Sequence, residues 1–77
     1  MAKNKMEKEL KKIMSQIFNV PIETIVPTSS ADTIESWDSL RHLDLISELE
    51  YHFDLEFTEK QMIEMTSFEN VLKIISK

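Results

Sequence analysis

The sequence predicts an all-α fold, a small four-helix bundle with three longer helices, one short third helix and a long first loop. Two observations predict this fold class. Apolar residues recur at helical spacing in three segments, and two helix-start signatures only eight residues apart delimit a brief helix before the last one. With 77 residues, the chain is long enough for one small domain, which we expect to span residues 1–77.

The first helix is predicted over residues 3–18, where the lysines lie mostly opposite an apolar stripe. The stripe that we expect to enter the core consists of Met6, Leu10, Ile13, Met14 and Ile17. Pro21 and the Asn19-Val20 pair before it end this helix.

A long connection follows over residues 19–37, punctuated by Pro21, Pro27 and a Thr-Ser-Ser run. Connections of this length are uncommon in compact domains unless they have a role of their own. We expect this one to pack across the core, with one short helical turn near Ile22–Ile25. The apolar residues that suggest this are Val20, Ile22, Ile25 and Val26.

The second helix is predicted over residues 39–53, with Asp38 as its N-cap. At about 100° per residue, apolar residues gather on one side of this helix, and Leu45 lies at the margin of that side. The predicted core positions are Leu43, Ile46, Leu49 and Phe53. Leu40 falls on the other side, which also carries Arg41, Asp44, Glu48 and Tyr51. An apolar residue there is either a contact for a partner or an ordinary exposed leucine.

Capping boxes delimit the last two helices, since in each a Ser or Thr is followed three residues later by Glu or Gln. Thr58–Gln61 predicts a short third helix that contains Met62 and Ile63, and Thr66–Glu69 starts the last helix. The apolar face of the last helix consists of Phe68, Val71, Leu72 and Ile75.

The connection between the second and third helices, residues 54–57, alternates apolar and acidic residues like a strand. It has no partner strand in the sequence, so we predict a loop. Leu55 and Phe57 are expected to anchor this loop in the core.

The net charge of −5 is distributed unevenly. Residues 1–18 carry five lysines against two glutamates, whereas residues 38–57 carry six acids against one arginine. The acidic centre argues against nucleic acid, which needs a basic face, and favours a partner with a positive patch. The lysines of the first helix are interpreted as a solvated face, because Glu7 and Glu9 interrupt them.

Two residue types are absent, and each absence excludes a class of site. Without cysteine there is no disulfide and no cysteine-based metal site or nucleophile. Without glycine there is no glycine-rich phosphate loop, EF-hand loop or Rossmann turn. No apolar run approaches the ~20 residues that cross a bilayer, and none of signal-peptide length follows the basic start. We therefore expect a cytoplasmic protein without membrane insertion. A monomer is the expectation for a small acidic bundle.

Few residues could support catalysis, and we predict neither a catalytic residue nor a metal site. His42 and His52 lie some 80° apart around the second helix and about 15 Å apart along it, so they cannot share a metal. We expect His42 at the surface near Ser39, and His52 at the margin against the third helix. Nothing in the sequence orients His42 as a catalytic base for Ser39, so we do not expect an enzyme.

Ser39 is the best candidate for a chemical role. A serine near a helix start is usually a cap, but Asp38 already fills that position. At the first helical position Ser39 would point outward beside unpaired backbone N–H groups, where a covalently attached phosphate is stabilised. The pattern therefore indicates an attachment point for a phosphate-bearing group.

Asp38-Ser39-Leu40 at the start of an acidic helix resembles the attachment motif of acyl carrier proteins. The resemblance covers nearly the whole chain and includes the long first loop, the short third helix and the helix that Thr66 initiates. Within the second helix it runs through Leu43-Asp44-Leu45-Ile46, Leu49-Glu50 and Phe53. The tripeptide alone occurs by chance in many proteins, but its combination with chain length, acidic helix and helix order is specific. It implies an acyl-carrier-protein-like bundle.

The resemblance also implies a cofactor and a function. In that family the serine corresponding to Ser39 carries a covalent 4′-phosphopantetheine arm, which a separate phosphopantetheinyl transferase adds from coenzyme A. The arm ends in a thiol that holds acyl groups as thioesters, and the carrier itself catalyses nothing. It delivers intermediates to loading and synthase enzymes through basic docking patches. An attached chain can fold into a cavity under the second helix, which here would be lined by Leu43, Ile46, Leu49, Met62 and Ile63.

The family's partner-contacting positions map to five residues of this chain. They are Asp38, Leu40, Asp44, Glu48 and Glu50. Leu40, left open above, becomes an expected docking contact through this resemblance.

Departures from the fatty-acid carriers bear on the pathway. Trp37 stands where glycine is common, and Arg41, Tyr51 and His52 stand where acids are common. Arg41 lies three residues from Asp44 and would screen it. A Trp-Asp-Ser run resembles carriers of dedicated pathways. The predicted function is therefore acyl transport in fatty-acid, polyketide or related biosynthesis. The alternatives are an aminoacyl or peptidyl carrier, for example of D-alanine, and an unmodified helical interaction module.

Overall fold

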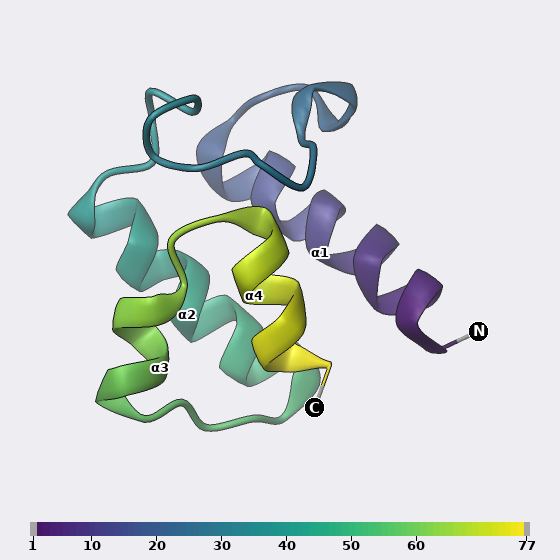
Figure 1. The fold of residues 1–77 in the computed structure, drawn as a ribbon, viewed down its shortest axis with the longest axis vertical. Coiled ribbons are helices and arrows are strands. Elements are labelled where there is room, and N and C mark those ends of the chain that lie inside the picture. Colours follow the sequence, from purple (N-terminus) through teal and green to yellow (C-terminus); the bar gives the residue numbers. More distant parts are fainter. Residues whose placement is uncertain (1, 77) are drawn as a thin grey trace.

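The computed structural model describes residues 2–76 and consists of helices joined by loops (Figure 1). In chain order these are α1 (Ala2–Phe18), the 3₁₀ turn η1 (Ile22–Thr24), α2 (Ser39–Phe53), α3 (Glu59–Glu64) and α4 (Phe68–Ile75). The described residues form no β-strand, only a single bridge between Ser30 and Ser67. The predicted all-α four-helix fold is confirmed, including the bounds of α2. The first and last residues of the predicted domain lie outside the described part.

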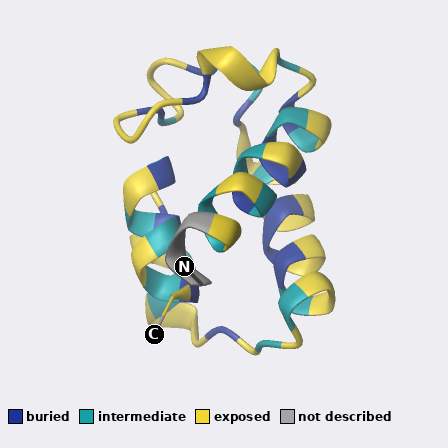
Figure 2. Cartoon of the chain, turned by 90° about the vertical axis from the view of Figure 1, so that its right-hand side faces the viewer, coloured by how far each residue is buried: buried dark blue, intermediate teal, exposed yellow. Residues whose placement is uncertain are grey.

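One apolar core lies between the helices, and their buried faces turn toward it (Figure 2). From α1 the core takes Leu10, Ile13 and Met14, as predicted, together with Phe18 at the helix end. Met6 and Ile17 of the predicted stripe are only partly buried. The remaining core residues are Ile25, Ile34, Trp37, Leu45, Ile46, Leu49, Phe57, Met65, Phe68, Val71 and Ile75.

The buried face of α2 is rotated from the one predicted. Leu45, placed at the margin, is fully buried, whereas Leu43, placed in the core, is 57% exposed. The cause is α3, which lies on the Leu43 side but has only six residues, none of them buried. A helix that short cannot cover Leu43, so Leu43 stays exposed, and Leu45 joins Ile46 and Leu49, which are buried as predicted.

The long loop contains the predicted helical turn and contacts the start of α4. Ile25 is buried as expected, whereas Ile22 and Val26 are exposed. The backbone carbonyls of Pro27 and Ser29 accept hydrogen bonds from Glu69 N at 3.0 Å and Phe68 N at 2.8 Å. The loop thus satisfies two of the backbone donors that every helix start leaves free.

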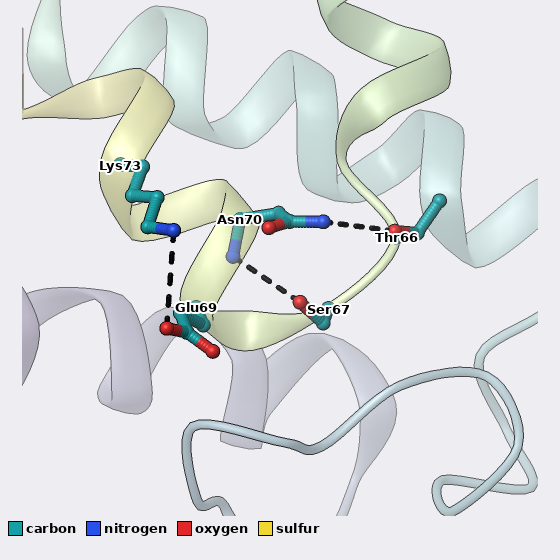
Figure 3. A network of polar contacts seen from close by, with 5 residues as sticks. All are labelled: Thr66, Ser67, Glu69, Asn70 and Lys73. Atoms are coloured by element: carbon teal, nitrogen blue, oxygen red, sulfur yellow. Dashed lines mark hydrogen bonds and ion pairs between the residues drawn. The ribbon is translucent and has the colours of Figure 1, made fainter.

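Capping at the start of α4 differs from the prediction by one residue. Ser67, not Thr66, is the N-cap, and its hydroxyl accepts from Asn70 N at 3.2 Å. Figure 3 shows Thr66 beside it, accepting from the Asn70 side chain at 3.1 Å, while Glu69 pairs with Lys73 at 3.9 Å. The loop carbonyls already hold the first two N–H groups of α4, so the next free donor lies within reach of Ser67.

The other predicted capping box is present. Thr58 Oγ1 accepts from Gln61 N at 3.1 Å, and Gln61 Oε1 accepts from Thr58 N at 2.9 Å. The connection from α2 to α3 is a loop, as predicted, with Phe57 buried and Leu55 partly buried. Within the described part of the chain, no helix is long and apolar enough to cross a membrane.

Candidate functional site

The start of α2 presents Ser39 as predicted. Asp38 is the N-cap, and its Oδ1 accepts from Arg41 N at 2.9 Å. Ser39 is the first helical residue and is exposed, and its hydroxyl makes no hydrogen bond with any residue that the structure describes. Because Asp38 performs the capping, the Ser39 hydroxyl is free to react with an external group.

The residues just before Ser39 attach the start of α2 to the end of α1. Ser36 Oγ donates to the carbonyl of Phe18 at 2.6 Å. The Trp37 ring stacks on the Phe18 ring, with centroids 4.8 Å apart, and only 6% of Trp37 is exposed. Trp37 is therefore a core residue, and any influence that it has on partners is indirect.

Arg41 strengthens the same junction. Its Nη1 donates to the carbonyl of Ile17 at 2.6 Å, at the end of α1 where a positive charge is favourable. The ion pairs found among the described residues do not include the expected Arg41–Asp44 pair. The free carbonyls at the end of α1 give the guanidinium a hydrogen-bonded partner, which explains why it turns away from Asp44.

The two histidines occupy environments different from those predicted. His42 is half-buried, with Nδ1 3.0 Å from Trp37 Nε1 and Nε2 3.0 Å from the carbonyl of Met62. His52 faces α1 rather than α3, since its Nε2 lies 3.2 Å from Glu9 Oε2. Helical geometry places both residues correctly on α2, but their partners come from segments distant in sequence.

These contacts also bear on catalysis and metal binding. Both ring nitrogens of His42 are hydrogen-bonded elsewhere, so the imidazole is not positioned as a base for Ser39. No group of three or more His, Cys, Asp or Glu side chains among the described residues is arranged to hold a metal ion. The arrangement at Ser39 suits attachment rather than turnover.

An open, largely apolar groove of about 580 Å³ runs beside Ser39 between α2 and α3. Leu43, Ile46, Met62 and Ile63 line it, as predicted for an apolar cargo, but Leu49 lies in the core and does not. The groove also has lining residues that the sequence did not predict. The additional lining residues are Ala31, Trp37, Asp38, His42, Glu59, Met65 and Thr66.

The outward side of α2 is acidic with one prominent apolar residue. Asp38, Asp44 and Glu48 are exposed, and Leu40 is 74% exposed, which confirms its outward orientation. Glu50 differs, because it is half-buried and its Oε2 accepts from Phe57 N at 3.0 Å. As contacts with a partner, all five residues stay predictions.

Comparisons with known proteins agree with this geometry. A search with family models gives no match. A curated relative, an acyl carrier protein of Buchnera aphidicola subsp. Schizaphis graminum (strain Sg), is 32% identical over 73 residues, which cover 95% of this chain and 92% of the relative. The solution NMR structure of a holo acyl carrier protein from Geobacter metallireducens superposes with a TM-score of 0.82 at 25% identity. That match covers 92% of this chain and 82% of the Geobacter chain.

Proposed function

The chain belongs to the acyl carrier protein family, and we propose that it carries acyl groups as thioesters on a 4′-phosphopantetheine arm attached to Ser39. Members of this family are carriers and not enzymes. The assignment of the site rests on one observation, the different roles of Asp38 and Ser39 at the start of α2. Asp38 caps the helix, and the exposed hydroxyl of Ser39 makes no hydrogen bond within the described part of the chain.

The residues around Ser39 fit a phosphodiester. The N-terminal turn of α2 presents the positive end of the helix dipole, which stabilises an attached phosphate. The backbone N–H of Arg41 is already bonded to Asp38, so the N–H groups of Ser39 and Leu40 remain for a phosphate. A separate phosphopantetheinyl transferase would form the bond to Ser39 Oγ with coenzyme A as donor. When bound, the arm supplies the thiol that holds the acyl group.

The groove beside Ser39 supports an apolar cargo. Leu43 and Ile63 expose apolar surface along it, and Met62 forms part of its wall. Burying such surface against an acyl chain is favourable by about 25 cal/mol per Å². Methionine adapts its shape readily, so the Met62 side of the groove can accommodate chains of different form. Cargo that folds into this groove would be partly shielded from water.

The acidic side of α2 supports docking to enzymes with basic patches. Asp38, Asp44 and Glu48 would steer such partners, and Leu40 would add an apolar contact at the centre. We rank Glu50 last among the predicted contacts, because its carboxylate already binds the backbone of Phe57. The proposed partners are the transferase and loading or synthase enzymes of fatty-acid, polyketide or related biosynthesis. Aminoacyl cargo is the alternative, and a single-domain, monomeric, cytoplasmic carrier stays a prediction.

Intact mass spectrometry after incubation with coenzyme A and a broad-specificity phosphopantetheinyl transferase tests the proposal. The wild-type chain should gain the mass of one arm, and Ser39→Ala should gain nothing. Ser47→Ala is the matched control, because Ser47 is also an exposed serine of α2, and it should be modified like the wild type. Modification of Ser39→Ala would show that the site is wrong. An unmodified wild type that still binds its partners would instead favour the helical interaction module.

A further inference from the structure

His42 connects three segments that meet at the groove. The residue belongs to the first turn of α2, its Nδ1 contacts Trp37 of the long loop, and its Nε2 contacts the carbonyl of Met62 in α3. Its ring also lies nearly parallel to that of Trp37, with centroids 6.2 Å apart and planes 22° apart. We propose that His42, as a neutral imidazole with its proton on Nε2, is the positioning residue that holds α3 against the start of α2 and sets the width of the groove beside Ser39.

The two partners select one tautomer of the His42 ring. The Trp37 indole N–H can only donate, so Nδ1 must accept and carries no proton. The Met62 carbonyl can only accept, so Nε2 must carry the proton and donate. Neutral imidazole with its proton on Nε2 satisfies both contacts. The imidazolium has N–H groups on both nitrogens and loses the Trp37 bond.

Few contacts fix the position of α3, so loss of the bond between His42 and Met62 should affect that position. None of the six residues of α3 is buried, and Ile63 is 69% exposed. The segment is held at its ends by Phe57 before it and Met65 after it, both of them buried. The bond from His42 reaches Met62 in between, and so it holds the middle of α3 at the groove.

Both ring nitrogens of His42 have uncharged hydrogen-bond partners. The charged residues that the structure describes along the groove are Asp38, at the start of α2, and Glu59, in the first turn of α3, and both are acidic. The neighbouring cation, Arg41, directs its guanidinium to Ile17 on α1. The contacts of the ring are therefore with Trp37 and Met62, and removal of the imidazole should loosen α3 at the groove.

Nuclear magnetic resonance of the unmodified protein tests this inference, so its outcome is independent of whether Ser39 carries an arm. The ¹⁵N signals of the His42 ring should show the Nε2–H tautomer at about pH 7.5, above the ordinary titration range of imidazole. The amides of α3 should then exchange roughly three- to tenfold faster in His42→Ala than in the wild type, after correction for intrinsic rates. His42→Gln, which keeps one acceptor and one donor, should restore most of the protection.

Rescue by glutamine separates positioning from mere packing. Trp37 is the only tryptophan, so its fluorescence reports on the surroundings of one indole, which include the His42 contact. Its emission and the exchange rates of the α3 amides should change together in His42→Ala. His42→Gln should restore both toward the wild-type values. His52→Gln, which removes the other histidine, should leave both unchanged.

Three results would overturn the inference. The first is an Nδ1–H tautomer in the folded wild type at neutral pH. The second is a fluorescence change in His52→Gln as large as the change in His42→Ala. The third is an exchange of the α3 amides in His42→Ala that equals the wild-type exchange, which would show that the ring does not hold α3.

Discussion

The two walls of the groove beside Ser39 are built differently. The α2 wall rests on Leu45, Ile46 and Leu49, all of them buried in the core. The α3 wall has no buried residue of its own. One wall is therefore part of the hydrophobic core, while the other is held by its flanking residues, by polar contacts and by the partly buried Met62, which packs against the core.

The difference assigns separate roles to the two walls. Ser39 stands on the α2 wall, whose start is tied to α1 through Ser36, Trp37 and Arg41. The proposed attachment point on that wall would keep one position while cargo changes. The α3 wall, whose Met62 and Ile63 line the groove, would be able to shift for chains of different size at little cost to the core. Segments with few buried contacts are also those that open at the lowest free energy.

The largest expected effect comes from truncating one apolar residue on each wall. Leu49→Ala should lower the free energy of unfolding by about 2–5 kcal/mol, because it leaves a cavity in the core. Ile63→Ala should change it by no more than about 0.5 kcal/mol, because that side chain is mostly exposed. Urea unfolding followed by circular dichroism measures both. Equal losses in the two variants would mean that α3 belongs to the core as much as α2 does.

Features of the chain that depend on short-range physics could be predicted from the sequence. The bounds of α2 and its Asp38 cap follow from residue spacing and from one hydrogen bond across three residues. The Thr58 capping box is equally local. The exposure of Ser39 could be predicted for the same reason, because Asp38 already caps the helix. These features decide where the proposed attachment point lies.

Features that depend on which segments meet could not be predicted in the same way. The structure buries Leu45 of α2 where the sequence predicted Leu43, because α3 is too short to cover Leu43. The hydrogen-bond partners of His42 lie in the long loop and in α3. A helical wheel of α2 contains neither segment, so these contacts could not be predicted from it. Ser67 replaced Thr66 as a cap because the long loop supplies carbonyls to the start of α4. Each correction arises from a tertiary contact.

Removing the N-cap of α2 or of α3 should show whether the two groove walls differ in their role in attachment. Asp38→Ala and Thr58→Ala should each lower the free energy of unfolding by about 0.5–2 kcal/mol, since each leaves backbone N–H groups of a first turn unpaired. Only Asp38→Ala should also slow attachment of the phosphopantetheine arm, because only α2 presents Ser39. Initial rates of mass gain with the transferase measure this second effect. An equally slow Thr58→Ala would show that the transferase depends on α3 as well.

The smallest expected effect distinguishes two glutamates two residues apart on α2. Glu50 accepts a hydrogen bond from Phe57 N, in the segment that leads to α3, whereas Glu48 is exposed. Glu50→Ala should therefore lower the free energy of unfolding by about 0.5–1.5 kcal/mol, and Glu48→Ala should leave it within about 0.5 kcal/mol of the wild type. Partner binding should show the reverse order. Glu48→Ala should slow association with a basic partner enzyme at low salt, and the difference should shrink as salt screens the charge. If Glu50→Ala impaired binding more than Glu48→Ala at unchanged stability, the Glu50 carboxylate would be available to partners despite its bond to Phe57, and α3 would be held without it.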